Sequence, residues 1–322
     1  MTMTRRWAAL TMTGAVVSAA GCGAVSAQGS LMIAPPGGVA PMRWASSRFG
    51  DRIEPRAAVL LPIRFDGVDK TFYAQFDLGA KSTVFYGKTL AAASVRIPTL
   101  KSGPKGQPGA LGFTIGDVRV SIPKPGVRAD IGDPTIAWDD PEAVDLIGTI
   151  GVDMLEGRVL TIDFKAMRLH VGDAAPQELA AQARWSPMAL KSRWVLLDAT
   201  LEGKPTKLLL DTGSSAFALL IDKTRWSEMT NGQDTEIFAV NSWGKKLMAH
   251  TAPTKARVVI GGLETPLGDA TYIEGTSAMQ GLMMRATGMG GMTGNRLFFD
   301  RVLILDAPGG RYAVIEPKSP PN

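Results

Sequence analysis

Short apolar segments separated by turn residues make up most of the chain from about residue 57 onward. Residues 59–63 (VLLPI), 72–76 (FYAQF) and 302–305 (VLIL) are examples, and Gly, Pro or Asp stands close to each. Short apolar runs bounded by such residues predict strands rather than helices. We therefore expect an all-β fold, with short helical turns after Gly151 and Gly294.

The pattern occurs twice along the chain. Three motifs recur in the same order: an Asp-x-Gly motif after an apolar strand, a β-rich stretch broken by Gly, and a later Gly before an apolar strand that ends in Asp. They lie at Asp77 and Asp211, at Gly116 and Gly261, and at Gly151 and Gly294. The copies are 134, 145 and 143 residues apart at these motifs. This nearly constant offset predicts an internal duplication and two similar lobes.

Composition between the repeated segments predicts the domain boundaries. Residues 28–50 are rich in Pro and Gly and have little periodicity, whereas 174–184 are polar and rich in Ala. Such stretches are typical of linkers. The predicted units are a signal peptide at 1–27, a leader or linker at 28–56, an N-terminal lobe at 57–173, an interlobe linker at 174–190 and a C-terminal lobe at 191–322.

The N-terminus has the three parts of an export signal. Arg5 and Arg6 precede an apolar stretch over 7–20, and the small residues at 25–27 form a cleavage site. Cys22 follows small residues, as in a bacterial lipobox, so lipid attachment there is the alternative to cleavage. The apolar stretch is short for a membrane span. We expect an exported protein, periplasmic or secreted, whose only membrane contact would be a lipid on Cys22.

Composition and charge argue against several functions. The chain has 35 Lys and Arg against 30 Asp and Glu without a basic cluster, so we expect no nucleic-acid partner. Cys22 is the single cysteine, so the folded part has no disulfide. His170 and His250 are the only histidines, and no cysteine joins them, so we expect neither a metal nor a cofactor.

The second Asp-x-Gly motif has the parts of a rigid site. The apolar run 208–210 delivers Asp211 onto a turn at Gly213, whose backbone N–H groups can face the carboxylate. A surface β-turn is the alternative, because Asp, Thr and Ser are ordinary turn residues. The preceding apolar strand and the second copy at Asp77 favour the site.

These motifs resemble those of the aspartic peptidases, and each half resembles one retropepsin subunit. The resemblance implies β-barrel-like lobes around a central cleft, with Asp77 and Asp211 as the catalytic pair. It also implies a peptide or protein substrate, no metal, and a monomer that is internally a pseudo-dimer. The loops that would surround the pair comprise Leu78, Gly79, Ala80, Thr212, Gly213 and Ser214. Family members also cover the cleft with a hairpin flap, for which 101–109 and 241–245 are the candidates.

Leu78 departs from the family pattern. The family has Thr or Ser there, whose hydroxyl reaches the opposite loop; Thr212 retains this hydroxyl. Ala80 likewise cannot donate to its Asp, whereas Ser214 can. The sequence therefore predicts an exported aspartic endopeptidase, with a peptide-binding relative that does not cleave as the main alternative. A structural envelope protein, in which both motifs are plain turns, is a third.

Overall fold

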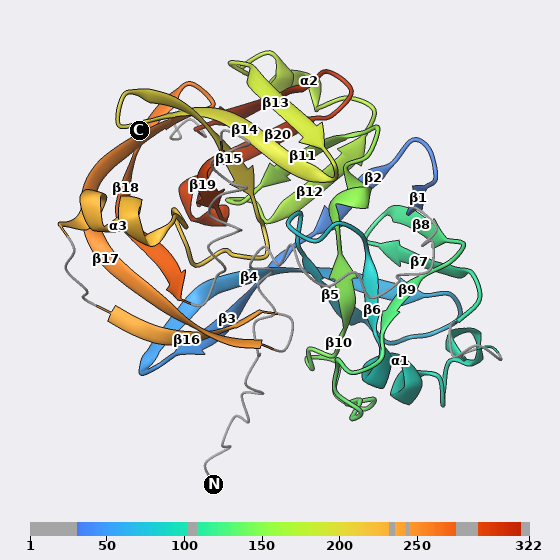
Figure 1. Ribbon diagram of the computed structural model, residues 1–322. Helices are drawn as coiled ribbons and strands as arrows, with labels where there is room; N and C mark the ends of the chain where they lie inside the picture. Colours follow the sequence, from blue (N-terminus) through green and yellow to red (C-terminus); the bar gives the residue numbers. More distant parts are fainter. Residues whose placement is uncertain are drawn as a thin grey trace, which may run out of the picture.

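The computed structural model describes residues 31–316 except 102, 104–107, 232–235, 243–244 and 275–288. Strands predominate, which confirms the all-β prediction (Figure 1). The short helical segments of the described residues are α1 (Gly87–Ala93), η1 (Pro98–Leu100), η2 (Val152–Met154), α2 (Gln177–Ala180), α3 (Lys223–Thr230) and η3 (Asn295–Phe298). Two of them, η2 and η3, are the turns expected after Gly151 and Gly294.

Two sheets contain the described strands. The first sheet comprises β1 (Met32–Ile33), β3 (Arg43–Phe49), β4 (Arg52–Phe65), β5 (Phe72–Phe76), β6 (Val84–Tyr86), β7 (Leu111–Ile115), β8 (Val118–Ile122), β9 (Gly126–Arg128) and β10 (Leu146–Ile150). The second comprises β2 (Gly38–Pro41), β11 (Val159–Asp163), β12 (Arg168–Gly172), β13 (Ser186–Lys191), β14 (Trp194–Leu201), β15 (Lys204–Leu210), β16 (Glu236–Ser242), β17 (Lys245–Ile260), β18 (Leu263–Glu274), β19 (Met289–Thr293), β20 (Val302–Asp306) and β21 (Arg311–Ile315).

A pseudo-twofold axis passes through the second sheet. Strands β11 and β20 are antiparallel, and Thr161 lies opposite Ile304. These residues are 143 positions apart, the same offset that relates Gly151 to Gly294. Because equivalent residues of the two copies face each other, the axis runs between them. On one side follow β12 and β2, and on the other β21 and β13.

The predicted linkers at 28–56 and 174–190 were wrong in part. Strands β13 and β2 lie at the two ends of the set β13-β21-β20-β11-β12-β2. Strand β3 also falls within 28–56, and β4 begins at Arg52 rather than near residue 57. Small and turn-forming residues concealed these strands: β2 is GVAP, and the buried positions of β3 include Ala45 and Ser47. The boundaries of the two lobes otherwise stay a prediction.

Matching glycines turn matching hairpins. Gly116 joins β7 to β8 with a φ of +57°, and Gly261 joins β17 to β18 with a φ of +58°. Left-handed φ values are available to glycine without steric cost. This equivalence of Gly116 and Gly261 is what the repeated sequence predicts.

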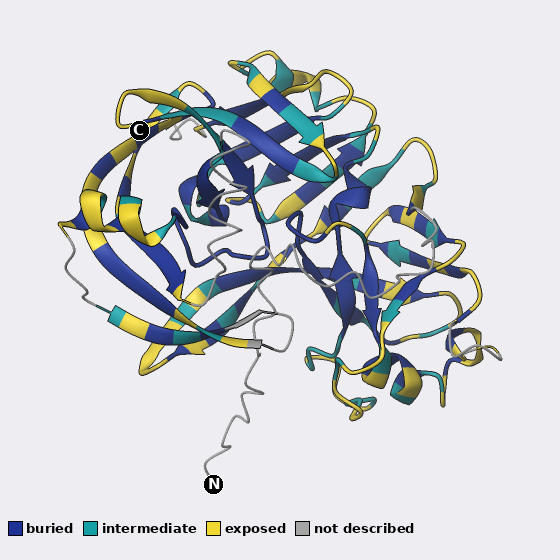
Figure 2. Ribbon diagram, in the orientation of Figure 1, coloured by how far each residue is buried: buried dark blue, intermediate teal, exposed yellow. Residues whose placement is uncertain are grey.

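The two halves of the chain contain equivalent parallel strand pairs amid mostly antiparallel neighbours. Strand β5 is parallel to β10, with Phe76 opposite Ile150, and β15 is parallel to β19, with Leu210 opposite Thr293. Strands β5 and β10 are buried along most of their length (Figure 2). Buried residues at the ends of β5 and β15 therefore lead directly into the two Asp residues.

Candidate active site

The two Asp loops have the same backbone anchor. The Asp77 N–H donates to the Ile150 carbonyl at 3.0 Å, and the Asp211 N–H donates to the Thr293 carbonyl at 2.9 Å. Each bond continues a parallel strand pair by one residue. The start of each loop is thus fixed by the strand that leads to the later glycine of the same half.

Those later glycines lie directly against the loops. A Cβ atom on Gly294 would lie 1.8 Å from the carbonyl oxygen of Ser214, and one on Gly151 would lie 2.4 Å from the carbonyl carbon of Ser82. Neither distance leaves room for a side chain. The glycine segments therefore pack under the Asp loops.

The two loops face each other across the axis. A Cβ atom on Gly79 would lie 2.6 Å from Cγ of Asp211, and one on Gly213 would lie 2.5 Å from Cγ of Asp77. Each carboxyl thus lies against the loop of the other copy, and both residues are fully buried. The structure therefore brings the two predicted Asp residues together as a pair.

Backbone and hydroxyl groups orient the carboxyls. Asp77 Oδ1 accepts hydrogen bonds from the N–H groups of Gly79 at 2.9 Å and Ala80 at 3.1 Å. Asp211 Oδ1 accepts from the Gly213 N–H at 2.9 Å, and its Oδ2 accepts from the Ser214 hydroxyl at 2.9 Å. The hydroxyl donor to Asp211, in place of a second backbone N–H, is the asymmetry that the sequence predicts from Ala80 and Ser214.

Burial raises the pKa of both carboxyls above the usual 3.8. The pKa of Asp77 rises well above that value, first through burial and second through the negative charge of Asp211. Hydrogen bonds from Asp77 and Ser214 partly offset the effect of burial on the pKa of Asp211. Both shifts favour a state in which the pair keeps one proton rather than ionising twice.

A single threonine ties the loops together on one side. Thr212 Oγ1 accepts a hydrogen bond from the Leu78 N–H at 2.8 Å and donates to the Phe76 carbonyl at 3.0 Å. Leu78 itself is fully buried in the main apolar core and returns no such bond. The prediction that Thr212 still reaches across while Leu78 does not is confirmed.

Sequence reasoning missed Gln75. Its side chain lies on β5, is 4% exposed, and donates from Nε2 to the Gly213 carbonyl at 3.2 Å. No motif draws attention to a glutamine in an apolar strand. A signal was nevertheless present, because the offset between Asp77 and Asp211 aligns Gln75 with Leu209.

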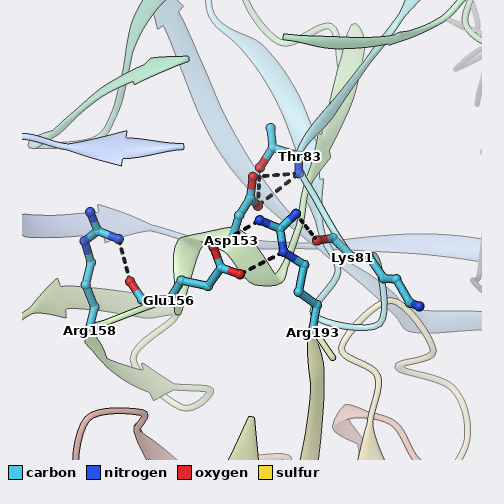
Figure 3. Close-up of polar contacts among 6 residues, drawn as sticks. All are labelled: Lys81, Thr83, Asp153, Glu156, Arg158 and Arg193. Atoms are coloured by element: carbon cyan, nitrogen blue, oxygen red, sulfur yellow. Dashed lines mark hydrogen bonds and ion pairs between the residues drawn. The ribbon is translucent and has the colours of Figure 1, made fainter. Parts of the chain in front are cut away.

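Sequence reasoning also missed a cluster of polar side chains that holds the segment directly after the first Asp loop (Figure 3). Asp153 accepts hydrogen bonds from the Thr83 N–H at 2.9 Å and the Thr83 hydroxyl at 2.8 Å. Arg193, from the turn between β13 and β14, donates to Glu156 at 2.8 Å and to the Lys81 carbonyl at 3.3 Å. The second half of the chain thus braces the loop that carries Asp77.

The structure describes less of the first flap candidate, 101–109, than of the second, 241–245. Most of 101–109 lies outside the described residues, and so do positions 243–244 of the second candidate. Strands β16 and β17 flank that second segment as an antiparallel pair, with Ser242 opposite Lys245. Phe238 of β16 packs against Phe49 of the β3–β4 hairpin, with ring centroids 4.9 Å apart. The second candidate therefore joins two paired strands, and its role as a flap stays a prediction.

Two further observations concern the described residues alone. They contain no cluster of three His, Cys, Asp or Glu side chains arranged as metal ligands. Among their helices, none has the length and apolar character needed to cross a bilayer.

Comparison with known proteins gives similarity only among solved structures. No protein-family model matches the chain, and no curated protein sequence matches it. An aspartic proteinase from Irpex lacteus is 12% identical, with a TM-score of 0.46 over 81% of this chain and 94% of that chain. Conglutin gamma, a basic 7S globulin from lupine seeds, is 9% identical, with a TM-score of 0.48 over 90% and 96%. Basic 7S globulin from soybean is 10% identical, with a TM-score of 0.43 over the same shares. Similarity at this level assigns no activity to the chain.

Proposed function

We propose that this protein is an aspartic endopeptidase, in which Asp77 and Asp211 share one proton and hydrolyse a peptide bond with an activated water. The observation that carries the proposal is the pair of fully buried carboxyls, each packed against the loop of the other copy. Two carboxylates so close cannot both ionise cheaply, so the pair retains a proton to donate. Both loops come from one chain, so we propose that a monomer suffices.

The asymmetry of the pair assigns a role to each residue in this mechanism. Asp211, whose charge is stabilised by Ser214 and Gly213, acts as the base that takes a proton from water. Asp77 donates its proton to the carbonyl oxygen of the substrate, where negative charge develops as water adds. When the tetrahedral intermediate collapses, Asp211 gives the leaving amine the proton that it took from water. Asp77 takes a proton back from a hydroxyl of the intermediate, so the pair again holds one proton. No covalent bond to the protein forms.

A peptide-binding relative that does not cleave is the second candidate. Leu78 favours it, because one of the two loops lacks the hydroxyl that Thr212 provides in the other. The complete burial of Asp77 and Asp211 favours it as well, since a substrate has to gain access to both carboxyls before any proton moves. Binding without hydrolysis would follow if that access stops short of the pair.

Cleavage of a mixed peptide library between about pH 3 and pH 7 separates the two candidates. The peptidase is expected to release products that mass spectrometry identifies, with the highest rate at acid or mildly acidic pH. Retention of peptides on the immobilised protein without any product would support the binding protein. Neither cleavage nor retention at any pH would contradict both.

A further inference from the structure

The two copies of the Asp motif have exchanged a polar and an apolar residue. The offset of 134 residues that aligns Asp77 with Asp211 also aligns Leu78 with Thr212 and Gln75 with Leu209. The first copy is therefore polar two residues before its Asp and apolar one residue after it. The second copy has the reverse arrangement.

Each polar member of this exchange crosses to the opposite loop. Thr212 bonds to the backbone at Phe76 and Leu78, whereas Gln75 donates to the Gly213 carbonyl at 3.2 Å. Both side chains are buried, so water does not compete for these bonds. The loops are thus joined by two polar ties that run in opposite directions and start from positions that are not equivalent.

The apolar members of the exchange are committed to packing. Leu78 belongs to the main apolar core. Leu209 belongs to a smaller cluster with Phe49, Phe217 and Phe238. A polar group at either position would lose this contact, so a tie between the loops has to start elsewhere in each copy.

We propose that Gln75 is a positioning residue of the Asp pair, which holds the second loop through the Gly213 carbonyl and supplies the tie that Leu78 cannot. Gly213 is the link to both carboxyls. Its N–H donates to Asp211 Oδ1 at 2.9 Å, and its Cα packs against the carboxyl of Asp77 so closely that a Cβ would lie 2.5 Å from Cγ. A shift of the Gly213 peptide therefore moves Asp211 and loosens the contact with Asp77. The expected effect on catalysis rests on the proposed function, whereas the effect on the carboxyls does not.

The test converts each position to the residue of the other copy. Gln75→Leu removes the tie, Leu78→Thr adds a hydroxyl in the first loop, and the double variant exchanges one for the other. For Gln75→Leu we expect kcat to fall about tenfold with KM changed less than about twofold, because a misaligned pair affects the reaction more than binding. The double variant loses the Gln75 tie but gains the Thr hydroxyl. We therefore expect its kcat to lie within about threefold of the kcat of the Leu78→Thr variant.

Carbon-13 NMR of the Asp side-chain carboxyls gives a measurement that does not need turnover. Asp77→Asn and Asp211→Asn assign the two signals. In Gln75→Leu the two titration steps of the Asp pair are expected to lie closer together in pH than in wild type. The double variant should restore the wild-type separation of the two steps. Thr161→Val serves as the control, because it removes a buried hydroxyl that has no partner among the described residues and lies on the central sheet.

The outcomes separate the two claims. If wild type does not cleave but Gln75→Leu changes the titration and the double variant restores it, the proposed function fails and the positioning role stands. If Gln75→Leu titrates and turns over like wild type, or if the single effects simply add, the positioning role is wrong. Should Gln75→Leu fail to fold, folding of the double variant would support the exchange, and failure of both would overturn it.

Discussion

The hydroxyl of Thr212 accepts a hydrogen bond from the Leu78 N–H group at 2.8 Å and so joins the two Asp loops. The same hydroxyl donates to the Phe76 carbonyl at 3.0 Å. One side chain of the second loop thereby satisfies two backbone groups of the first. All of this takes place in the interior, since Thr212 and Leu78 are fully buried.

Thr212→Val should destabilise the fold although its volume barely changes. The substitution leaves the Leu78 N–H and the Phe76 carbonyl buried without their partner. An unsatisfied buried group costs about 1–3 kcal/mol, so the free energy of unfolding is expected to fall by at least that amount. Urea denaturation measures the loss. Thr212→Ser keeps the hydroxyl and should lose less; an equal loss in both variants would show that the methyl group matters instead.

Gly79→Ala should separate the two carboxyls. The added Cβ would lie 2.6 Å from Cγ of Asp211, so one loop has to move away from the other. We expect the loss of at least about 99% of any peptidase activity, since a displacement of about 1 Å can cost a hundredfold in rate. Gly112→Ala is the matched control, because it lies on β7 outside the flap candidates and a Cβ there meets only Asp66 Oδ2, at 3.9 Å. Full activity in the Gly79 variant would contradict the arrangement of the loops.

The stability of the fold should depend on the proton of Asp77. Burial raises the pKa of this carboxyl well above 3.8, so the folded state holds the proton more tightly than the unfolded chain. The resulting stabilisation is complete below the unfolded pKa and is lost as the pH rises through the higher, folded pKa. Asp77→Asn stays neutral throughout and should therefore gain stability relative to wild type as the pH rises from about 4 to 8.

Denaturation of both proteins across that pH range measures this difference. The same substitution at exposed Asp139 is the control and should leave the pH dependence as it is in wild type. A stability difference between Asp77→Asn and wild type that shrinks as the pH rises would have the wrong sign and would argue against a buried, protonated Asp77.

The predicted export signal makes a prediction about the mass of the mature protein. Removal of residues 1–27 leaves a chain that starts at Gln28, whereas lipid attachment leaves one that starts at Cys22 with an added acyl mass. Intact-mass measurement on protein from its native host separates the two products. Recovery of an unprocessed chain starting at Met1 in the cytoplasm would show that export does not occur.

The repeated motifs make the Asp pair predictable from the amino-acid sequence. An offset near 140 residues relates the motifs that carry Asp77 and Asp211 and those at Gly151 and Gly294, and the structure places equivalent residues at equivalent points around the axis. Hydrophobic periodicity also predicts the all-β class. Both inferences depend only on local sequence patterns and on their repetition, and a single sequence is enough to show both.

What could not be predicted depends on contacts between distant segments. Strand β2 has only four residues, GVAP, and its pairing with β12 is what keeps it extended. The tie from Gln75 depends on the position of Gly213, which is 138 residues away. An isolated glutamine in an apolar strand does not indicate its partner, although comparison with Leu209 in the other copy would have drawn attention to it.

Peptide cleavage by the wild type, Asp77→Asn, Asp211→Asn and the double variant tests the central claim most directly. Water activation and carbonyl protonation are divided across one shared proton, so neither half works alone. Each single variant is expected to lose about a hundredfold to ten-thousandfold in kcat without unfolding, and the double variant should lose no more than either. Cleavage that survives Asp211→Asn at the wild-type rate would contradict the shared-proton pair.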